Sequence, residues 1–368
     1  MKIVVFEAEP REAPAFEKLK GGHDLVLVEA PLRDDNASAH ADANVVSTFV
    51  YSELHKGVLE KLPSLKLIAT RSTGYDHIDT SYCDARGITV SNVPTYGANT
   101  VAEHVFALLL AISHRLPEAM ERAQRGHFSP EGLEGFDLAG KTLGVIGTGN
   151  IGRHVIRIAK GFGMEVVAFD ARPDLRFANE AGFRYAEIEE LLGASDVITL
   201  HVPSLPETRH MLSARAFSHM KGGVVVINTA RGDLIDTRAL IQELTSGKVT
   251  AAGLDVLPDE PMIREEAELI CSFFCDQHDL RNLVANHVLL RMRNVIVTPH
   301  SAFNTREAVG RIVHTTVGNI EGFLAGAPIN VVAGPSATPA ERGDARPPAA
   351  QRSGAARDPE AERKEDRR

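Results

Sequence analysis

A glycine-rich turn between an apolar run and a helix-like segment constrains this 368-residue chain more than any other feature. The run 142–146 leads into Gly147, Gly149 and Gly152, and a helix-like segment follows at 153–162. The first glycine permits a tight turn, the second lets the backbone approach a pyrophosphate, and the third allows the helix to pack closely on the strand. This order predicts a parallel α/β fold that binds a dinucleotide at a helix N-terminus.

An acidic residue at the end of the next predicted strand indicates which dinucleotide fits. The strand 165–169 is followed by Asp170, about 18 residues after the last glycine. A carboxylate there can accept hydrogen bonds from the adenosine ribose and repels the 2′-phosphate of NADP, so we predict NAD. Arg172 lies nearby and keeps NADP as the alternative cofactor. A role as a helix cap or turn residue is the alternative for Asp170.

Short apolar runs alternate with helix-like segments along most of the chain, as in parallel βα units. One series lies before residue 94 and a second begins at 142, so we predict two doubly wound, Rossmann-like parallel-sheet domains of the α/β class. The apolar segment 99–115 should be a buried helix that connects the domains or forms a dimer surface. The expected domains are a discontinuous substrate domain, 1–100 and 299–332, and a cofactor domain, 101–298.

The end of the chain differs in composition from the rest. Residues 333–368 are rich in Ala, Pro, Gly, Glu and Arg and contain no aromatic residue. Such a segment cannot bury enough apolar surface to offset the entropy lost on ordering, so we predict a disordered tail. Its mixed charges leave a docking segment open as the alternative.

Charge and cysteine content exclude several classes of partner. A formal net charge of -9 gives no general attraction to nucleic acid or anionic membranes, and no apolar run approaches transmembrane length. The chain becomes acidic at Glu7 before any signal-like run, and three cysteines are too few for a disulfide framework, so we expect a cytoplasmic protein. No metal site is predicted, because the spacing of Cys271, Cys275, His278 and His287 matches no standard zinc motif.

A cation, a carboxylate and an imidazole follow three strands of the second series. Arg231, Glu260 and His300 each come shortly after the end of such a strand. Because open parallel sheets bind ligands at the carboxyl ends of their strands, these groups should share one crevice. An arginine fork can bind a carboxylate and a keto oxygen, and a histidine beside a carboxylate can donate a proton near neutral pH. The set predicts hydride transfer to a 2-keto acid, with all three as catalytic residues.

The sequence resembles the D-isomer-specific 2-hydroxyacid dehydrogenase family over about residues 1–332. The resemblance implies an NAD-dependent enzyme acting on a small 2-keto or 2-hydroxy acid, and a homodimer formed through the cofactor domain, with 101–115 as the candidate surface. Besides the glycine loop and Asp170, it rests on His201-Val202-Pro203 with Thr208, Asn228-Thr229-Ala230-Arg231-Gly232, Gly253-Leu254-Asp255-Val256 with Glu260, and Thr298-Pro299-His300.

The same resemblance implies a role for each matching residue. Arg231, Glu260 and His300 would be catalytic, and Asp255 would contact the nicotinamide or support the histidine. The cofactor-binding residues would be Gly147, Gly149, Asn150, Ile151, Gly152, Asp170, Val202, Pro203, Thr208, Thr229, Ala230, Arg231, Asp255 and His300. The substrate-binding residues would be Thr73, Gly74, Tyr96, Arg231, Phe303 and Tyr51.

Within the family, the stretches 71–79, 93–96 and 101–104 are similar to bacterial fermentative D-lactate dehydrogenases, as is the roughly 40-residue interval from Glu260 to His300. This similarity predicts the reduction of pyruvate to D-lactate. The stretch Gly97-Ala98-Asn99 departs from the usual pattern and leaves open a reductase for glyoxylate, hydroxypyruvate or another 2-keto acid. A function as an NAD(H)-sensing, corepressor-like binding protein is a further alternative, because fold alone does not decide function.

Overall fold

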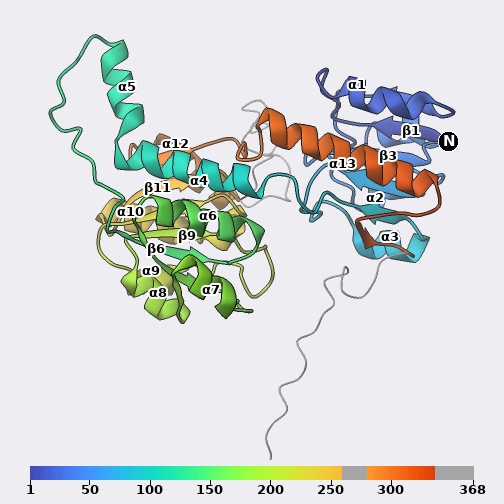
Figure 1. The fold of residues 1–368 in the computed structure, drawn as a ribbon. Coiled ribbons are helices and arrows are strands. Elements are labelled where there is room, and N and C mark those ends of the chain that lie inside the picture. Colours follow the sequence, from blue (N-terminus) through green and yellow to red (C-terminus); the bar gives the residue numbers. More distant parts are fainter. Residues whose placement is uncertain (259–279, 336–368) are drawn as a thin grey trace, which may run out of the picture. The chain divides into compact units, whose positions relative to one another are not determined.

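The computed structural model describes residues 1–258 and 280–335 (Figure 1). The chain divides into two compact units, Met1–Pro94 together with the chain from Thr315 onward, and Thr95–His314. Each unit contains a mainly or wholly parallel sheet with helices, which confirms the predicted α/β class. Over the described residues, no helix combines the length and apolar character that a membrane span needs.

The first unit is built on a six-stranded sheet with the order β13-β5-β4-β3-β1-β2. Five strands are parallel, and β13 pairs antiparallel with β5. The strands β3 and β4 are buried along their whole length, as expected for central strands of a parallel sheet. The strands and α-helices of this unit are β1 (Lys2–Val5), α1 (Ala13–Phe16), β2 (Asp24–Leu27), β3 (Val45–Thr48), α2 (Lys56–Glu60), β4 (Leu67–Thr70), α3 (Thr80–Arg86), β5 (Thr89–Ser91) and β13 (Val331–Ala333).

A buried amide network fixes the C-terminal return to this unit. Asn319, in the later half of α13 (Arg306–Leu324), is fully buried, and its side-chain amide donates to the Asn92 carbonyl at 2.8 Å. The Asn330 amide donates to the Asn319 side chain at 2.8 Å, just before β13. Ala333 is buried in β13, so the expected tail cannot begin there; residues 336–368 lie outside the described part of the chain.

The second unit is built on a seven-stranded parallel sheet with the order β12-β11-β10-β9-β6-β7-β8. The strand β6 pairs with both β7 and β9, so the strand order reverses there, where such sheets bind ligands. Alternate residues of β10 contribute to two separate apolar clusters, Val224 and Val226 to one, Val225 and Ile227 to the other. Its strands are β6 (Thr142–Ile146), β7 (Glu165–Phe169), β8 (Arg184–Tyr185), β9 (Val197–Leu200), β10 (Val224–Asn228), β11 (Val249–Leu254) and β12 (Val295–Val297).

Helices cover this sheet, and α4 (Ala98–Ser113) is the longest helix that lies wholly in the unit among those described. It lies so close to β11 that a Cβ on Gly253 would be 3.1 Å from the Leu108 Cβ. Residues 95–100 and 299–314, expected in the substrate domain, cluster here because the starts of α4 and α13 pack on each other near Gly97 and Ala308. The other helices are α5 (Leu116–Gln124), α6 (Asn150–Gly161), α7 (Leu175–Ala181), α8 (Ile188–Ala194), α9 (Ala214–His219), α10 (Thr237–Ser246) and α12 (Leu280–Arg291).

Candidate active site

The glycine loop after β6 has the shape that a dinucleotide needs. Gly147 has φ 95°, and a Cβ on it would lie 2.7 Å from the His201 carbonyl oxygen. A Cβ on Gly152 would lie 2.1 Å from the Gly147 oxygen, so both positions require glycine. Gly149 caps α6 with φ -68°, and nothing lies within 4 Å of the place of its Cβ. The open space at Gly149 fits a pyrophosphate approaching the first turn of α6, which Asn150 and Ile151 begin.

This difference between the glycines predicts the effect of Gly149→Ala. The backbone conformation suits alanine and the protein leaves room for the methyl group, so the thermal midpoint without cofactor should be unchanged. The methyl group would occupy the space of the pyrophosphate, so NADH affinity, measured by fluorescence titration, should fall by about tenfold or more. Gly161→Ala, on the same helix and also in open space, is the control and should keep full affinity. Equal affinities of the two variants would contradict this placement of the pyrophosphate.

Asp170 lies directly over the glycine loop. It follows β7, and its carboxylate accepts hydrogen bonds from the Thr148 N–H at 2.7 Å, the Thr148 hydroxyl at 2.9 Å and the Arg172 N–H at 2.8 Å. The Tyr185 hydroxyl is 2.9 Å from the Thr148 hydroxyl and supports it from β8. These bonds hold the carboxylate where the adenosine ribose of a dinucleotide on this loop would lie. Thr148 and Tyr185 were not singled out from the sequence, because their partners belong to segments far along the chain.

The loop after β9 borders the other side of the glycine turn. The Val202 side chain would be 2.9 Å from a Cβ on Gly147, and the Thr208 hydroxyl closes the loop by donating to the Pro203 carbonyl at 2.7 Å. His201, for which we expected no role, has its Nε2 3.0 Å from the Thr199 hydroxyl, and its Nδ1 finds no partner among the described residues. Burial lowers the pKa of His201 to about 3, so the ring is neutral at physiological pH.

The turn after β10 presents Arg231. The Asn228 side chain accepts from the Ala230 N–H at 3.0 Å and donates to the Arg231 carbonyl at 2.8 Å, which fixes the turn. The neighbouring Thr229 is buried, and its hydroxyl has no partner among the described residues. A Cβ on Gly232 would lie 2.2 Å from the Leu257 carbonyl carbon, so this turn packs directly on the segment that leads toward Glu260. Glu260 itself lies outside the described residues.

Asp255 organises the loop that carries His300. It follows β11, is 1% exposed, and its carboxylate accepts hydrogen bonds from the N–H groups of Ser301 and Ala302, each at 2.9 Å. Its carbonyl accepts from the His300 N–H at 2.9 Å. His300 has φ 49°, a left-handed conformation that is uncommon for residues other than glycine. The loop is therefore held in an unusual conformation by a buried carboxylate.

The charge of Asp255 is maintained by its hydrogen bonds. Burial raises the pKa of this carboxyl, but hydrogen bonds from the side chains of His104 and Thr298 and from the N–H groups of Ala302 and Ser301 outweigh it and hold the pKa below its usual value. The carboxyl is therefore ionised over the physiological range. Asp255 is hydrogen-bonded to the main chain of the His300 loop, and the two roles expected for it stay predictions.

Tyr96 lies within electrostatic range of Arg231 and of the Asp255 carboxylate. Burial raises the pKa of its hydroxyl, the charge of Arg231 lowers it, and the charge of Asp255 raises it. Its carbonyl accepts a hydrogen bond from Arg311 at the start of α13, a contact that the sequence did not indicate. Phe303 follows the His300 loop, three residues beyond the histidine. The second unit thus places Arg231 and Asp255 within electrostatic range of Tyr96, and Asp255 holds the loop of His300.

The remaining expected substrate residues lie on the first unit. The Thr73 hydroxyl donates to the Val93 carbonyl at 2.7 Å, and the Asn92 amide donates to the Thr73 carbonyl at 2.7 Å. The Gly74 carbonyl accepts from the Ser72 hydroxyl at 2.6 Å. Tyr51 is 39% exposed, and its N–H donates to the Glu7 carboxylate at 3.1 Å. Hydrogen bonds that involve side chains therefore fix the loop of Thr73 and Gly74 and the loop of Tyr51.

Comparison with known proteins agrees with this geometry. The sequence model described as "D-isomer specific 2-hydroxyacid dehydrogenase, NAD binding domain" matches residues 106–302. The chain belongs to the D-isomer-specific 2-hydroxyacid dehydrogenase family. Its cofactor is therefore NAD, which fits the glycine loop and Asp170 described above.

Among the described residues, no group of three or more His, Cys, Asp or Glu side chains could hold a metal ion; Cys271, Cys275 and His278 lie outside them.

Relatives in the family differ in substrate. The chain is 35% identical to D-lactate dehydrogenase of Escherichia coli, covering 89% of this chain and 98% of that protein. It is 38% identical to glycerate dehydrogenase of Methylorubrum extorquens, covering 86% and 87%. The crystal structure of D-lactate dehydrogenase from Aquifex aeolicus, complexed with NAD and lactic acid, has a TM-score of 0.81 at 36% identity, covering 91% of this chain and all of that one.

Proposed function

We propose that this dehydrogenase reduces pyruvate to D-lactate. The observation that carries the proposal is the group formed by Arg231, Asp255 and Tyr96 with the His300 loop, at the carboxyl edge of the NAD-binding sheet. Tyr96 is half-buried within electrostatic range of Arg231, so we place it beside the substrate carboxylate that Arg231 would bind. The likeness to two D-lactate dehydrogenases supports this choice.

Each residue has a task in the reaction. When bound, NADH would supply the hydride that reduces the keto carbon. Arg231 binds the substrate carboxylate and polarises the carbonyl, while the His300 imidazolium donates its proton to the carbonyl oxygen. Glu260 stabilises the imidazolium, and Thr229 and Ala230 border the nicotinamide. We retain Thr73, Gly74, Tyr51 and Phe303 as proposed substrate contacts, and Asn150, Ile151, Val202, Pro203 and Thr208 as proposed cofactor contacts.

A steady-state assay of NADH oxidation tests the substrate. The panel is pyruvate, hydroxypyruvate, glyoxylate and phenylpyruvate, with NADPH as the alternative reductant. Pyruvate with NADH should give the highest kcat/KM, and chiral analysis should find D-lactate. A higher kcat/KM for hydroxypyruvate would favour the second candidate, a hydroxypyruvate reductase, which the glycerate dehydrogenase relative supports. Tight NADH binding with no reduction of any keto acid would instead indicate an NAD(H)-sensing binding protein.

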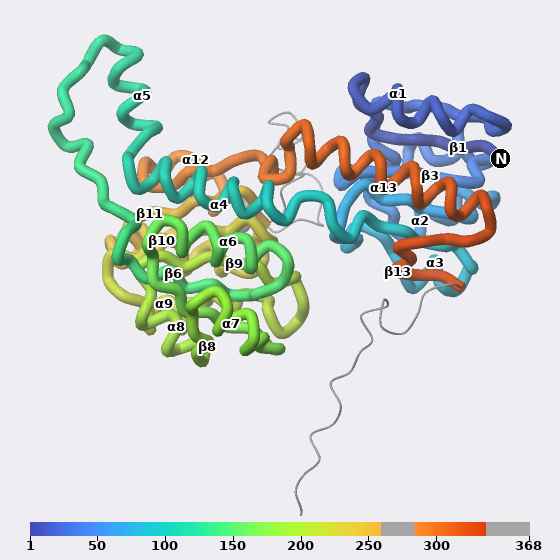
Figure 2. The backbone as a smooth tube through the Cα atoms, in the orientation of Figure 1, coloured from blue at the N-terminus to red at the C-terminus, as the bar shows by residue number. Residues whose placement is uncertain are grey.

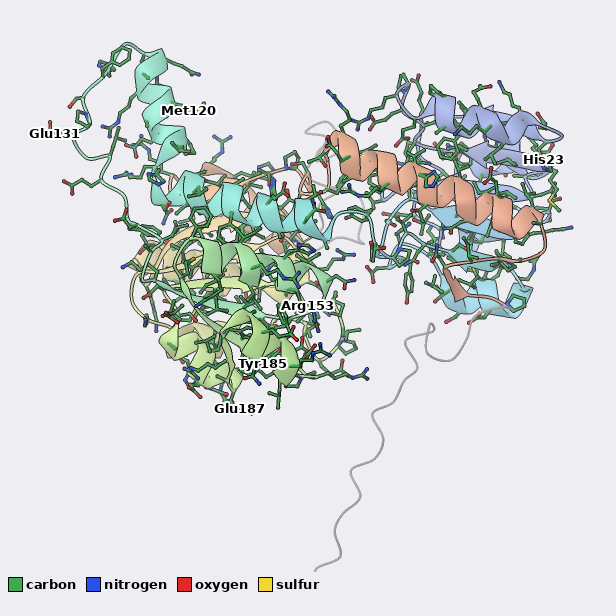
Figure 3. All side chains as sticks on the ribbon, in the orientation of Figure 1. His23, Met120, Glu131, Arg153, Tyr185 and Glu187 are labelled. Atoms are coloured by element: carbon green, nitrogen blue, oxygen red, sulfur yellow. The ribbon has the colours of Figure 1, made fainter. Side chains whose placement is uncertain are left out.

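We also propose that the enzyme is a homodimer, formed along α4 and the adjoining α5. The helix α5 has no buried residue, and Figure 2 shows it projecting from the second unit with the segment that follows. Met120, labelled in Figure 3, is 61% exposed, and Phe128 is 83% exposed. Large apolar side chains exposed together on a projecting element are typical of an interaction surface.

The substitution Met120→Glu tests the dimer. A charge placed in an apolar interface is left without a partner, so the variant should dissociate at concentrations where the native protein is dimeric. Light scattering coupled to size exclusion measures the mass of each. Leu175→Glu, which is 67% exposed on α7, is the matched control and should remain dimeric. A native protein that is monomeric at all concentrations would reject this proposal.

A further inference from the structure

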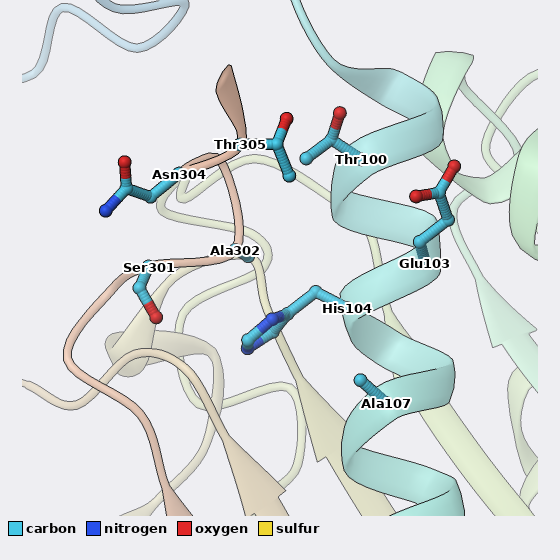
Figure 4. A pocket seen from close by; sticks show the side chains of 8 residues that line it. All are labelled: Thr100, Glu103, His104, Ala107, Ser301, Ala302, Asn304 and Thr305. Atoms are coloured by element: carbon cyan, nitrogen blue, oxygen red, sulfur yellow. The ribbon is translucent and has the colours of Figure 1, made fainter. Parts of the chain in front are cut away.

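His104 reaches from α4 to the carboxylate that organises the His300 loop. Its Nε2 is 3.4 Å from Asp255 Oδ1 and 3.1 Å from the Thr298 hydroxyl oxygen. Figure 4 shows the imidazole directed from α4 toward the chain segment of Ser301 and Ala302. The helix is separated from β11 and β12 by well over a hundred residues, so this contact is set by the tertiary fold.

The hydrogen-bond pattern defines which atom carries the proton. An ionised Asp255 can only accept, so the Thr298 hydroxyl, 2.5 Å from Oδ1, must donate to it. The Thr298 oxygen is then left as an acceptor for His104 Nε2, which therefore carries a hydrogen. Nε2–H is directed to Thr298 and lies near Asp255, so His104 completes the set of donors around this buried carboxylate.

This set of donors determines how the His300 loop is held. The two N–H groups next to His300 along the chain donate to the two oxygens of Asp255, and the His300 N–H donates to its carbonyl. If the carboxylate rotated, the two hydrogen bonds that it accepts from Ser301 and Ala302 would weaken together. The left-handed conformation of His300 would then lose its support, and the imidazole would no longer be kept in one place.

The surroundings of His104 make it replaceable without damage to the core. Its side chain is 21% exposed. It borders an open hollow of about 440 Å³ together with residues of α4 and the loop after His300 (Figure 4). The residues that line this hollow are Thr100, Glu103, His104, Ala107, Ser301, Ala302, Asn304 and Thr305. A substitution at position 104 thus leaves no closed cavity, and its effect reports on the lost hydrogen bonds.

We propose that His104 is a positioning residue, which fixes the Asp255 carboxylate through Nε2–H and thereby holds His300 in place for proton transfer. This proposal rests on the proposed function, in which His300 is the proton donor. It assigns to the first half of α4 a part in the chemistry, which acts through Asp255.

Three substitutions separate positioning from packing. His104→Phe keeps a ring but removes the donor, so kcat should fall by about tenfold to a hundredfold, as a misplaced catalytic group does. His104→Gln places an amide N–H near the position of Nε2 and should restore most of kcat. His104→Asn places its amide one bond too short and should resemble His104→Phe. NADH affinity and the thermal midpoint should stay close to native values in all three.

A readout that needs no turnover accompanies the kinetics. The rate at which diethylpyrocarbonate modifies His300, followed by mass spectrometry, should rise in the Phe and Asn variants and stay native in the Gln variant. Native kcat and modification rate in His104→Phe would overturn the proposal, as would equal losses in all three variants with lowered thermal midpoints. If the native protein reduces no keto acid, the proposed function fails, while the modification rates still decide whether His104 positions His300.

Discussion

Replacing His300 with asparagine should lower kcat for the preferred keto acid by about a hundredfold to ten-thousandfold, the usual contribution of general acid catalysis. Asparagine is the informative replacement because it tolerates the left-handed backbone conformation at φ 49°, whereas alanine would add strain to the loss of the proton donor. The loop bonds to Asp255 come from main-chain N–H groups, so they should persist. NADH affinity should therefore change by no more than about twofold, since the variant removes a group used in the chemical step.

Rapid-mixing kinetics with saturating NADH would measure the chemical step directly. His314→Asn, on α13, is a control that changes a histidine outside the proposed proton-transfer group and should retain native turnover. A His300→Asn enzyme that keeps native turnover with every keto acid reduced by the native protein would remove His300 from the mechanism. Loss of NADH affinity alone would mean that the residue serves the cofactor instead.

The substitution Arg71→Met should destabilise the protein by about 3–5 kcal/mol, the usual cost of leaving a buried charge without its partner. Arg71 is 1% exposed, and it donates to the carbonyls of Phe6 and Glu7 at 2.8 and 2.7 Å. Its Nε is 3.8 Å from the carboxylate of Glu12, which is 8% exposed. Methionine fills similar space but leaves two carbonyls without their donor and the Glu12 carboxylate without its ion-pair partner.

The pH dependence of that loss identifies its cause. Burial raises the pKa of Glu12, and the Arg71 charge opposes the rise. A carboxyl whose pKa is raised in the folded state stabilises the fold at low pH, and this contribution is lost as pH rises through the folded pKa. Without Arg71 the pKa should rise further, so the deficit should shrink on acidification.

Urea unfolding at neutral and at mildly acidic pH measures this deficit. Adding Glu12→Gln to Arg71→Met should recover part of the loss at neutral pH, because it removes the unpaired charge. Arg86→Met, on the exposed side of α3 in the same unit, should cost no more than about 0.5 kcal/mol. A pH-independent deficit, unchanged by Glu12→Gln, would show that lost packing and carbonyl bonds account for the whole effect.

The sequence was sufficient to predict the features that depend on local pattern. Gly147, Gly149, Gly152 and Asp170 form one strand-loop-helix-strand segment, and their required positions follow from backbone geometry alone. The positions of Arg231 and His300 at strand ends could be predicted as well, because parallel strands share one carboxyl edge.

Features that depend on distant contacts could not be predicted. The strand β13 pairs with β5 across more than two hundred residues, and its three-residue apolar pattern is too short to indicate a strand. The role of His104 depends on Asp255 and Thr298, and that of Arg71 on the carbonyls of Phe6 and Glu7. In each case, the sequence shows a polar residue and only the fold shows its partner.

The place of His300 after β12 has a consequence for how the enzyme loses activity on heating. β12 is an edge strand of three half-buried residues, and among the described strands it pairs with β11 alone. Edge strands of this kind can open locally at a lower free energy than the global transition. His300 and the N–H groups bound to Asp255 follow this strand directly, so transient fraying of the edge would disassemble the proton donor while the rest of the sheet stays folded. Thermal inactivation is thus expected to begin as a reversible local event, before the cooperative melting of the core.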